Sequence, residues 1–180
     1  MGHTIQALRL KGIEFKHRKR KCVGFHGTHK GNAEQIRKAG FDLAFAREKG
    51  CWLGTGIYFF DNAPYAGHEF ALCFATHLKK APQPIVIQAD INFIFLLDLN
   101  DDVNGPLFWK LFNLLRSMRG NSGVDENFTG HFIGTTIAKE MKSDGVAWRF
   151  PMQEAGGQNF GKMQNGFCVK KITVIGPIRI

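Results

Sequence analysis

Apolar and polar positions alternate in short runs along the first third of the chain, and this pattern predicts strands separated by a helix. Residues 22–28 are typical of a short strand that ends in a glycine turn, and residues 54–60 return to β character with aromatic and β-branched side chains. Between these runs, residues 32–39 have the composition and flanking residues of a helix. Residues 41–53 show no regular period, so we expect a loop there.

The rest of the chain alternates helical and extended patterns without an internal repeat. We expect a helix over 64–80, one long or two adjoining strands over 85–97, helices over 107–118 and 132–141, and strands over 145–150, 166–169 and 173–180. Residues 151–164 are rich in Gly, Gln and Asn and have no period, which predicts a surface loop. Together these elements predict one α+β domain.

The composition agrees with a single folded domain. Of the 180 residues, 44% are hydrophobic and 22% are charged, which is too apolar for a disordered chain. No apolar run approaches the roughly 18 residues of a membrane span, and the N-terminus, with basic residues from Arg9 onward, lacks the apolar stretch of a secretory signal. We therefore expect a cytoplasmic protein without a membrane partner. The four cysteines have no C-x-x-C spacing and are expected to be reduced thiols, not zinc ligands.

Positive charge is concentrated in the first part of the chain. Residues 1–80 carry 14 basic and 6 acidic side chains, a net charge of +8, whereas residues 81–180 carry 10 and 9, a net charge of +1. The densest basic run, over 16–21, suits a phosphate-binding edge for nucleic acid, a face for an acidic partner, or a solvated arm. We accordingly divide the chain into a basic N-terminal arm or strand, 1–21, and a single domain, 22–180.

Three short motifs follow one another along the chain. One strand ends in His26-Gly27-Thr28, the next begins with Gly54-x-Gly56-Ile57-Tyr58, and a late strand over 165–169 follows a polar loop. In this order and spacing the motifs resemble the His-Tyr-Glu branch of the ADP-ribosyltransferase fold, the branch of the poly(ADP-ribose) polymerases and diphtheria toxin. The similarity extends over residues 22–178. It implies an α+β fold in which two small antiparallel sheets form a split NAD cleft with flanking helices.

The resemblance implies roles for several residues around NAD. His26 would hydrogen-bond the adenosine ribose, Gly27 would let backbone groups approach the nicotinamide amide, and Tyr58 would stack on the nicotinamide ring. Thr28 would support this pocket through its hydroxyl group, and Gly56 would let the chain pass close to the dinucleotide. No metal is required for this arrangement.

The loop over 41–53 falls where the family has its donor loop, which covers the bound dinucleotide. Arg47 would meet the diphosphate there through charge-assisted hydrogen bonds, although a solvated position for this side chain is an equal alternative.

The third motif departs from the family pattern, in which a glutamate holds the nicotinamide ribose. Asn165 falls at this position, with Gln164 beside it, and neither side chain can offset positive charge on the reacting sugar. Glu154, the only carboxylate in the 151–164 loop, is a second candidate, either for this role or as a general base on the acceptor. The alternative for Glu154 is an exposed loop residue.

These features predict an NAD-dependent mono-ADP-ribosyltransferase, an enzyme of the glycosyltransferase class that uses NAD as its donor. Analogy with small bacterial members of the fold predicts a toxin of a toxin–antitoxin or phage-defence system. The basic half of the chain favours a nucleic-acid acceptor, with RNA preferred to DNA, and it would equally attract an acidic antitoxin. The alternatives are a protein acceptor, or a catalytically silent module of the same fold that only binds NAD or RNA.

Overall fold

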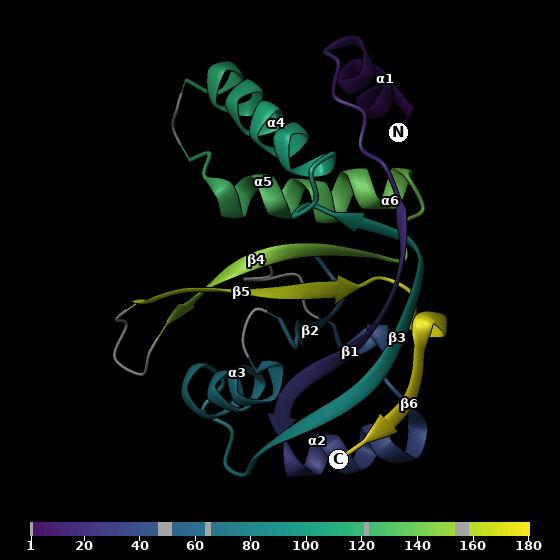
Figure 1. Cartoon of the computed structure of the whole chain (residues 1–180), viewed down its shortest axis with the longest axis vertical. Coiled ribbons are helices and arrows are strands. Elements are labelled where there is room, and N and C mark those ends of the chain that lie inside the picture. The colour runs from purple at the N-terminus through teal and green to yellow at the C-terminus, as the bar shows by residue number, and fades with distance from the viewer. Residues whose placement is uncertain (1, 47–51, 64–65, 121–122, 154–158) are drawn as a thin grey trace.

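The computed structural model describes residues 2–46, 52–63, 66–120, 123–153 and 159–180, and their arrangement is shown in Figure 1. The expected α+β class is confirmed. The strands are β1 (Arg18–His29), β2 (Ile57–Asp61), β3 (Pro84–Asp98), β4 (Gly145–Gln153), β5 (Asn159–Val169) and β6 (Ile175–Arg179). The helices are α1 (Gly2–Leu10), α2 (Lys30–Ala39), α3 (Gly67–Cys73), α4 (Asn104–Met118), α5 (Glu126–Phe132) and α6 (Ala138–Glu140).

The described strands form one hydrogen-bonded sheet in the order β1-β2-β5-β4-β3-β6. The expected 85–97 region is a single long strand, β3, which pairs with β1 along almost the whole of β1. This additional pairing closes β1, β2, β5, β4 and β3 into a ring. All strand pairs are antiparallel except β3 and β4, which run parallel over three residues of each.

Helices cover the ring on two sides (Figure 1). Helices α4, α5 and α6 lie over β4 and β5, with α1 beside α4, whereas α2 and α3 lie at the opposite end of the molecule. Under the first group is a helix-side cluster of buried side chains, which includes Leu97, Leu111, Ile133, Val146 and Cys168. A second group, here called the ring cluster, includes Ile87, Phe93, Leu96, Phe59 and Phe167 from the strands themselves.

The polar segment 151–164 was expected to be a loop, and that prediction is wrong for 151–153 and 159–164, whereas 154–158 lie outside the described residues. Strand β4 continues to Gln153 and β5 begins at Asn159, so both flanks of the segment are paired in an antiparallel ladder. Gly, Gln and Asn have low strand propensity, but propensity is overridden where a neighbouring strand supplies the backbone partners. Asn165 therefore lies in the middle of β5 and not at its start.

The N-terminal segment 1–21 contains regular structure. Helix α1 spans Gly2–Leu10, and the side chains of Leu8, Ile13 and Phe15 are buried in the helix-side cluster. Strand β1 begins at Arg18, so the last four of the six residues in the basic run belong to the sheet.

Candidate functional site

The ring of strands opens at His26. Strands β1 and β2 pair only at Gly24 with Asp61 and at Phe25 with Phe60. Beyond Phe25, β1 is paired only with β3, while the residues of β2 before Phe60 pair only with β5. His26 is therefore the first β1 residue at the point where the two strands separate, which is where the resemblance expects the cleft.

The imidazole of His26 bridges this opening. Its Nδ1 lies 2.8 Å from the carbonyl oxygen of Tyr58. A carbonyl oxygen can only accept, so Nδ1 carries the proton and Nε2 is left as an acceptor. Burial, together with a smaller effect of the positive charge of Lys79, lowers the pKa of His26 to about 4, against a still smaller opposing effect of the Tyr58 hydrogen bond. The ring is thus neutral at physiological pH.

The side chains of His26 and Tyr58 lie on opposite faces of β2. The His26 ring contacts Phe41 and Phe59, with ring centroids 5.4 and 5.7 Å apart. Tyr58 precedes Phe59 in the strand, so its side chain points to the other face, where it packs against the helix-side cluster. The structure therefore brings the two motif residues together through a ring nitrogen and a backbone carbonyl, not through their rings.

The hydroxyl of Tyr58 holds the chain that precedes β2. It accepts a hydrogen bond from the backbone N–H of Leu53 at 2.7 Å and donates one to the carbonyl of Gly54 at 2.8 Å. These two bonds fix the segment between the expected donor loop and β2. Arg47, the residue of that loop expected to meet the diphosphate, lies outside the described residues.

The motif glycines make close contacts within the protein. A Cβ at Gly27 would collide with the carbonyl oxygen of Ala71 in α3, and a Cβ at Gly56 would collide with Sγ of Cys168. These contacts account for glycine at both positions without a ligand. Thr28 is buried, and its hydroxyl accepts a 3.5 Å bond from the side chain of Asn32 in α2.

The third motif position holds amides in different settings. Gln164 is fully buried, and its Nε2 donates to the carbonyl oxygen of Asp61 at 2.5 Å, which ties β5 to the end of β2. Asn165 is partly buried and is paired with Arg149 of β4. Because successive strand residues alternate faces, Asn165 shares the face of Phe167, whose partner Phe59 contacts His26. Glu154 lies outside the described residues.

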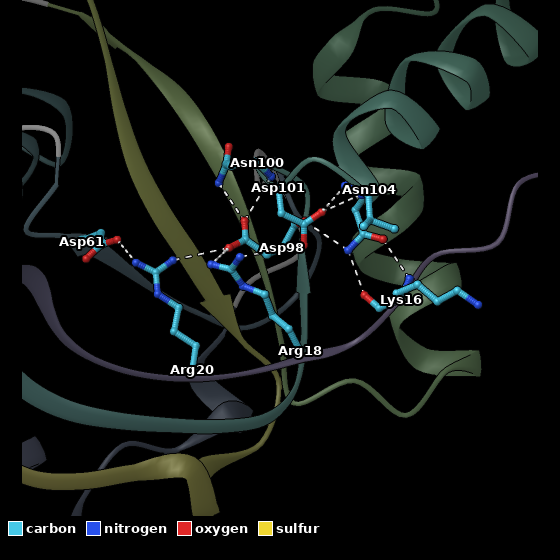
Figure 2. Close-up of polar contacts among 9 residues, drawn as sticks. Lys16, Arg18, Arg20, Asp61, Asp98, Asn100, Asp101 and Asn104 are labelled. Atoms are coloured by element: carbon cyan, nitrogen blue, oxygen red, sulfur yellow. Dashed lines mark hydrogen bonds and ion pairs between the residues drawn. The ribbon is translucent and has the colours of Figure 1, made fainter.

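Two arginines of the basic run are committed to carboxylates (Figure 2). Arg18 pairs with Asp98 at 2.6 Å, and Arg20 pairs with Asp61 and, at 3.6 Å, with Asp98. Asp98 is buried, and its carboxylate also accepts hydrogen bonds from Asn100. Thus part of the charge assigned to a nucleic-acid or antitoxin surface stabilises the sheet, while Lys19 and Lys21 of the same run are exposed.

Sequence reasoning missed a cavity whose lining residues do not include His26 or Tyr58. This cavity of about 500 Å³ lies where the segment before β2 meets the ends of α6 and β5, and Lys139, Lys142, Lys170 and Lys171 are among its lining residues. The available signal was weak, because these lysines come from two segments that the sequence does not place together. Lys139 and Lys142 are three residues apart at the end of a helix, and Lys170 and Lys171 are adjacent after a strand. Both arrangements are common on solvated surfaces.

Comparison with known proteins does not identify a family for the chain: none of the protein-family models matches it, and no curated protein matches it significantly. None of the described helices combines the length and the apolar character that crossing a membrane requires.

Proposed function

We propose that this chain is an NAD-dependent mono-ADP-ribosyltransferase. The observation that carries the proposal is the opening of the strand ring at His26. There the two motif strands stop pairing, and a neutral imidazole bridges them through the Tyr58 carbonyl. The acceptor at Nε2, which has no hydrogen-bond partner among the described residues, suits a ribose hydroxyl, which is the role that the resemblance gives to this histidine.

The proposed reaction is a substitution at the nicotinamide ribose. The bond between C1′ of this ribose and the nicotinamide nitrogen breaks, and its electron pair leaves with neutral nicotinamide. A lone pair on the acceptor forms the new bond to C1′, and the acceptor loses its proton to a base or to water. Positive charge develops on the ribose during this step, so a nearby anion would accelerate it.

The amides at the third motif position support a second candidate function. Gln164 is engaged with the Asp61 carbonyl, and Asn165 carries no charge. Neither can offset the charge on the reacting ribose. A module that binds NAD or RNA without turnover is therefore the alternative, unless Glu154 supplies the missing carboxylate.

We further propose that the acceptor is a nucleic acid, RNA before DNA, and that the protein acts as a toxin in the cytoplasm. The exposed Lys19 and Lys21 and the net charge of +9 support a polyanionic acceptor. The same surface suits an acidic antitoxin. A protein acceptor remains the alternative substrate.

The decisive experiment incubates the protein with NAD labelled in the adenosine moiety and with either cellular RNA or cellular protein. The enzyme proposal predicts label on one of these acceptors and release of free nicotinamide. NAD binding without release or labelling would instead establish the silent module. Absence of NAD binding would overturn the enzyme proposal, and absence of RNA binding as well would overturn the silent module.

Site variants test the assignment of residues. His26→Ala should abolish labelling because it removes the bridge and the Nε2 acceptor. Tyr58→Phe keeps the ring but loses the hydroxyl bonds to the 53–54 segment, so it should retain activity if the ring stacks on nicotinamide. Glu154→Gln and Asn165→Ala distinguish the two candidates for the third motif position. The variant at the residue that acts there should lose labelling, and the other variant should keep it. Full activity in both His26→Ala and Tyr58→Ala would refute the site.

A further inference from the structure

The lysine-lined cavity is separate from the opening at His26. Its volume of about 500 Å³ lies within the range of small-molecule sites, about 300 to 1,000 Å³. It is bounded by the segment that contains Thr55, by the end of α6, and by the residues that follow β5. None of the described residues that line it is acidic.

Three of the four lysines supply positive charge that no carboxylate neutralises within the described part of the chain. Lys170 points its ammonium group at backbone carbonyls, those of Leu53 at 2.5 Å and Thr55 at 2.7 Å. Lys139 and Lys142 are exposed and form no ion pair with a described acidic residue. Like charges gathered around one cavity repel each other, and an anion in the cavity would relieve that repulsion.

The fourth lysine is held in place by a buried aspartate. Lys171 donates to Asp144 at 2.7 Å, and the other oxygen of this carboxylate accepts from the backbone N–H groups of Ile94 and Phe95. Asp144 therefore balances one of four positive charges and fixes the wall of the cavity. The balance of the lining remains strongly positive.

The backbone at Lys142 gives an independent reason to assign a function here. Its φ is +55°, in the left-handed region that L-residues with a Cβ rarely adopt. The N–H of Ser143 bonds to the carbonyl of Ala138 at 2.8 Å, so Lys142 occupies the position of a helix-terminating Schellman motif at which glycine is usual. A lysine at this position costs stability relative to glycine, and it adds an ammonium group to the lining of the cavity.

We propose that this cavity binds the phosphate groups of a nucleotide-sized ligand. Lysine is a common phosphate ligand because its ammonium group presents three donors and a full charge. The ligand is either a free nucleotide or one nucleotide unit of a nucleic acid, since both present the same phosphate oxygens. The inference concerns binding only and does not depend on ADP-ribosyl transfer.

Binding is tested without NAD, using three probes: inorganic pyrophosphate and ADP by calorimetry, and a short labelled single-stranded RNA by fluorescence anisotropy. Tighter binding of ADP and pyrophosphate than of RNA assigns a free nucleotide, and the reverse assigns a nucleic acid. The double variant Lys139→Ala/Lys142→Ala should lower the affinity for the probe that binds by at least about tenfold, because two charge-assisted contacts are lost. If none of the three probes binds the wild-type protein, the proposal is overturned.

Lys30→Ala/Lys38→Ala is the matched control. It removes the same two charges from exposed positions on α2, at the end of the molecule away from α6 (Figure 1). It should change the affinity for pyrophosphate and ADP by less than about threefold, because screening weakens distant charges. Equal losses in the two double variants would show a general charge effect and refute the site. Pyrophosphate lacks the adenosine ribose that His26 is proposed to hold, so His26→Ala should bind pyrophosphate as the wild type does, which separates this inference from the proposed enzymatic function.

Lys142→Gly provides a test that poor folding cannot mimic. Glycine accepts the left-handed backbone without strain, so the variant should have a higher melting temperature than the wild type. It also lacks the ammonium group, so it should bind the probe more weakly. Higher stability with unchanged affinity would refute the role of Lys142.

Discussion

Arg18 donates to the buried carboxylate of Asp98 across 2.6 Å, and this pair joins the first residue of β1 to the last residue of β3. Arg20, two residues further along the same face of β1, reaches the same carboxylate and that of Asp61 in β2 (Figure 2). One short stretch of the most basic segment therefore holds three strands together. The arginines of this segment form ion pairs within the sheet, whereas Lys19 and Lys21 are exposed.

Loss of the charge at Asp98 should destabilise the fold. Asp98→Asn keeps the shape of the side chain but leaves Arg18 and Arg20 without this buried anion, and we expect a loss of about 3 kcal/mol in the free energy of unfolding. Urea denaturation measures the difference. Asp90→Asn is the control, since the Asp90–Arg179 pair is exposed and should contribute much less to stability than the buried Asp98 network. Equal effects would contradict a structural role for the Asp98 network.

His26 should make the protein sensitive to mild acid. Its pKa is about 4 in the folded protein and 6.5 in an unfolded chain, so the unfolded state binds the proton first as the pH falls. The stability that His26 contributes is complete above pH 6.5 and declines until the pH passes 4. The shift corresponds to about 3 kcal/mol.

The comparison variant for this pH dependence is His26→Gln, which can still donate to the Tyr58 carbonyl but does not titrate. Chemical denaturation of both proteins between pH 7 and 4 gives the two stability curves. The wild-type curve should fall more steeply, by about 3 kcal/mol over the range. Parallel curves would mean that His26 titrates normally.

Gly27 should be required for folding, independently of any role in ligand binding. A Cβ there meets the backbone of α3, which cannot move without shifting the helix, so Gly27→Ala should cost at least about 2 kcal/mol. Gly105→Ala in α4 is the matched change, because its Cβ would lie 3.5 Å from the nearest heavy atom, an ordinary contact. That variant should be stabilised by about 0.5 kcal/mol. Thermal unfolding of both variants checks the prediction.

Thr55 and Thr129 should respond in opposite ways to valine. Oγ1 of Thr55 is buried and finds no hydrogen-bond partner among the described residues, so Thr55→Val should be neutral or stabilising. Thr129 is fully buried and donates to the Asp125 carbonyl at 3.0 Å. Thr129→Val should therefore lose about 1 kcal/mol. Destabilisation by Thr55→Val would indicate a partner for its hydroxyl outside the described segments.

Local sequence patterns were sufficient to predict that most strands of the sheet exist, but not where each strand begins and ends. Alternating apolar positions located β2 and β3, whereas the charged start of β1 reads as a solvated arm. Arg18 and Arg20 become strand residues because Asp98 and Asp61 meet them, and those partners are 80 and 41 residues away in the chain. Such long-range pairing leaves no local period in the sequence.

The candidate site was predictable to a similar degree. The motif residues His26 and Tyr58 do lie side by side, joined by a 2.8 Å hydrogen bond. Side chains alternate between the two faces of a strand, so the face on which each ring lies depends on how the strand is oriented in the sheet. The short motifs do not specify that orientation. The glycines were interpreted as room for a ligand, yet the structure fills the space beside Gly27 and Gly56 with α3 and β5.

The ring of strands has a consequence for the order in which the chain folds. Strand β5 is the partner of both β2 and β4, and Ile57 pairs with Val169 across more than half of the chain. Contacts between such distant segments slow folding, because a long loop must close before any of them is gained. During synthesis, β1 and β3 can associate early, but β2 has no second neighbour until β5 emerges from the ribosome. We therefore expect slow folding, with completion of the ring as its late step.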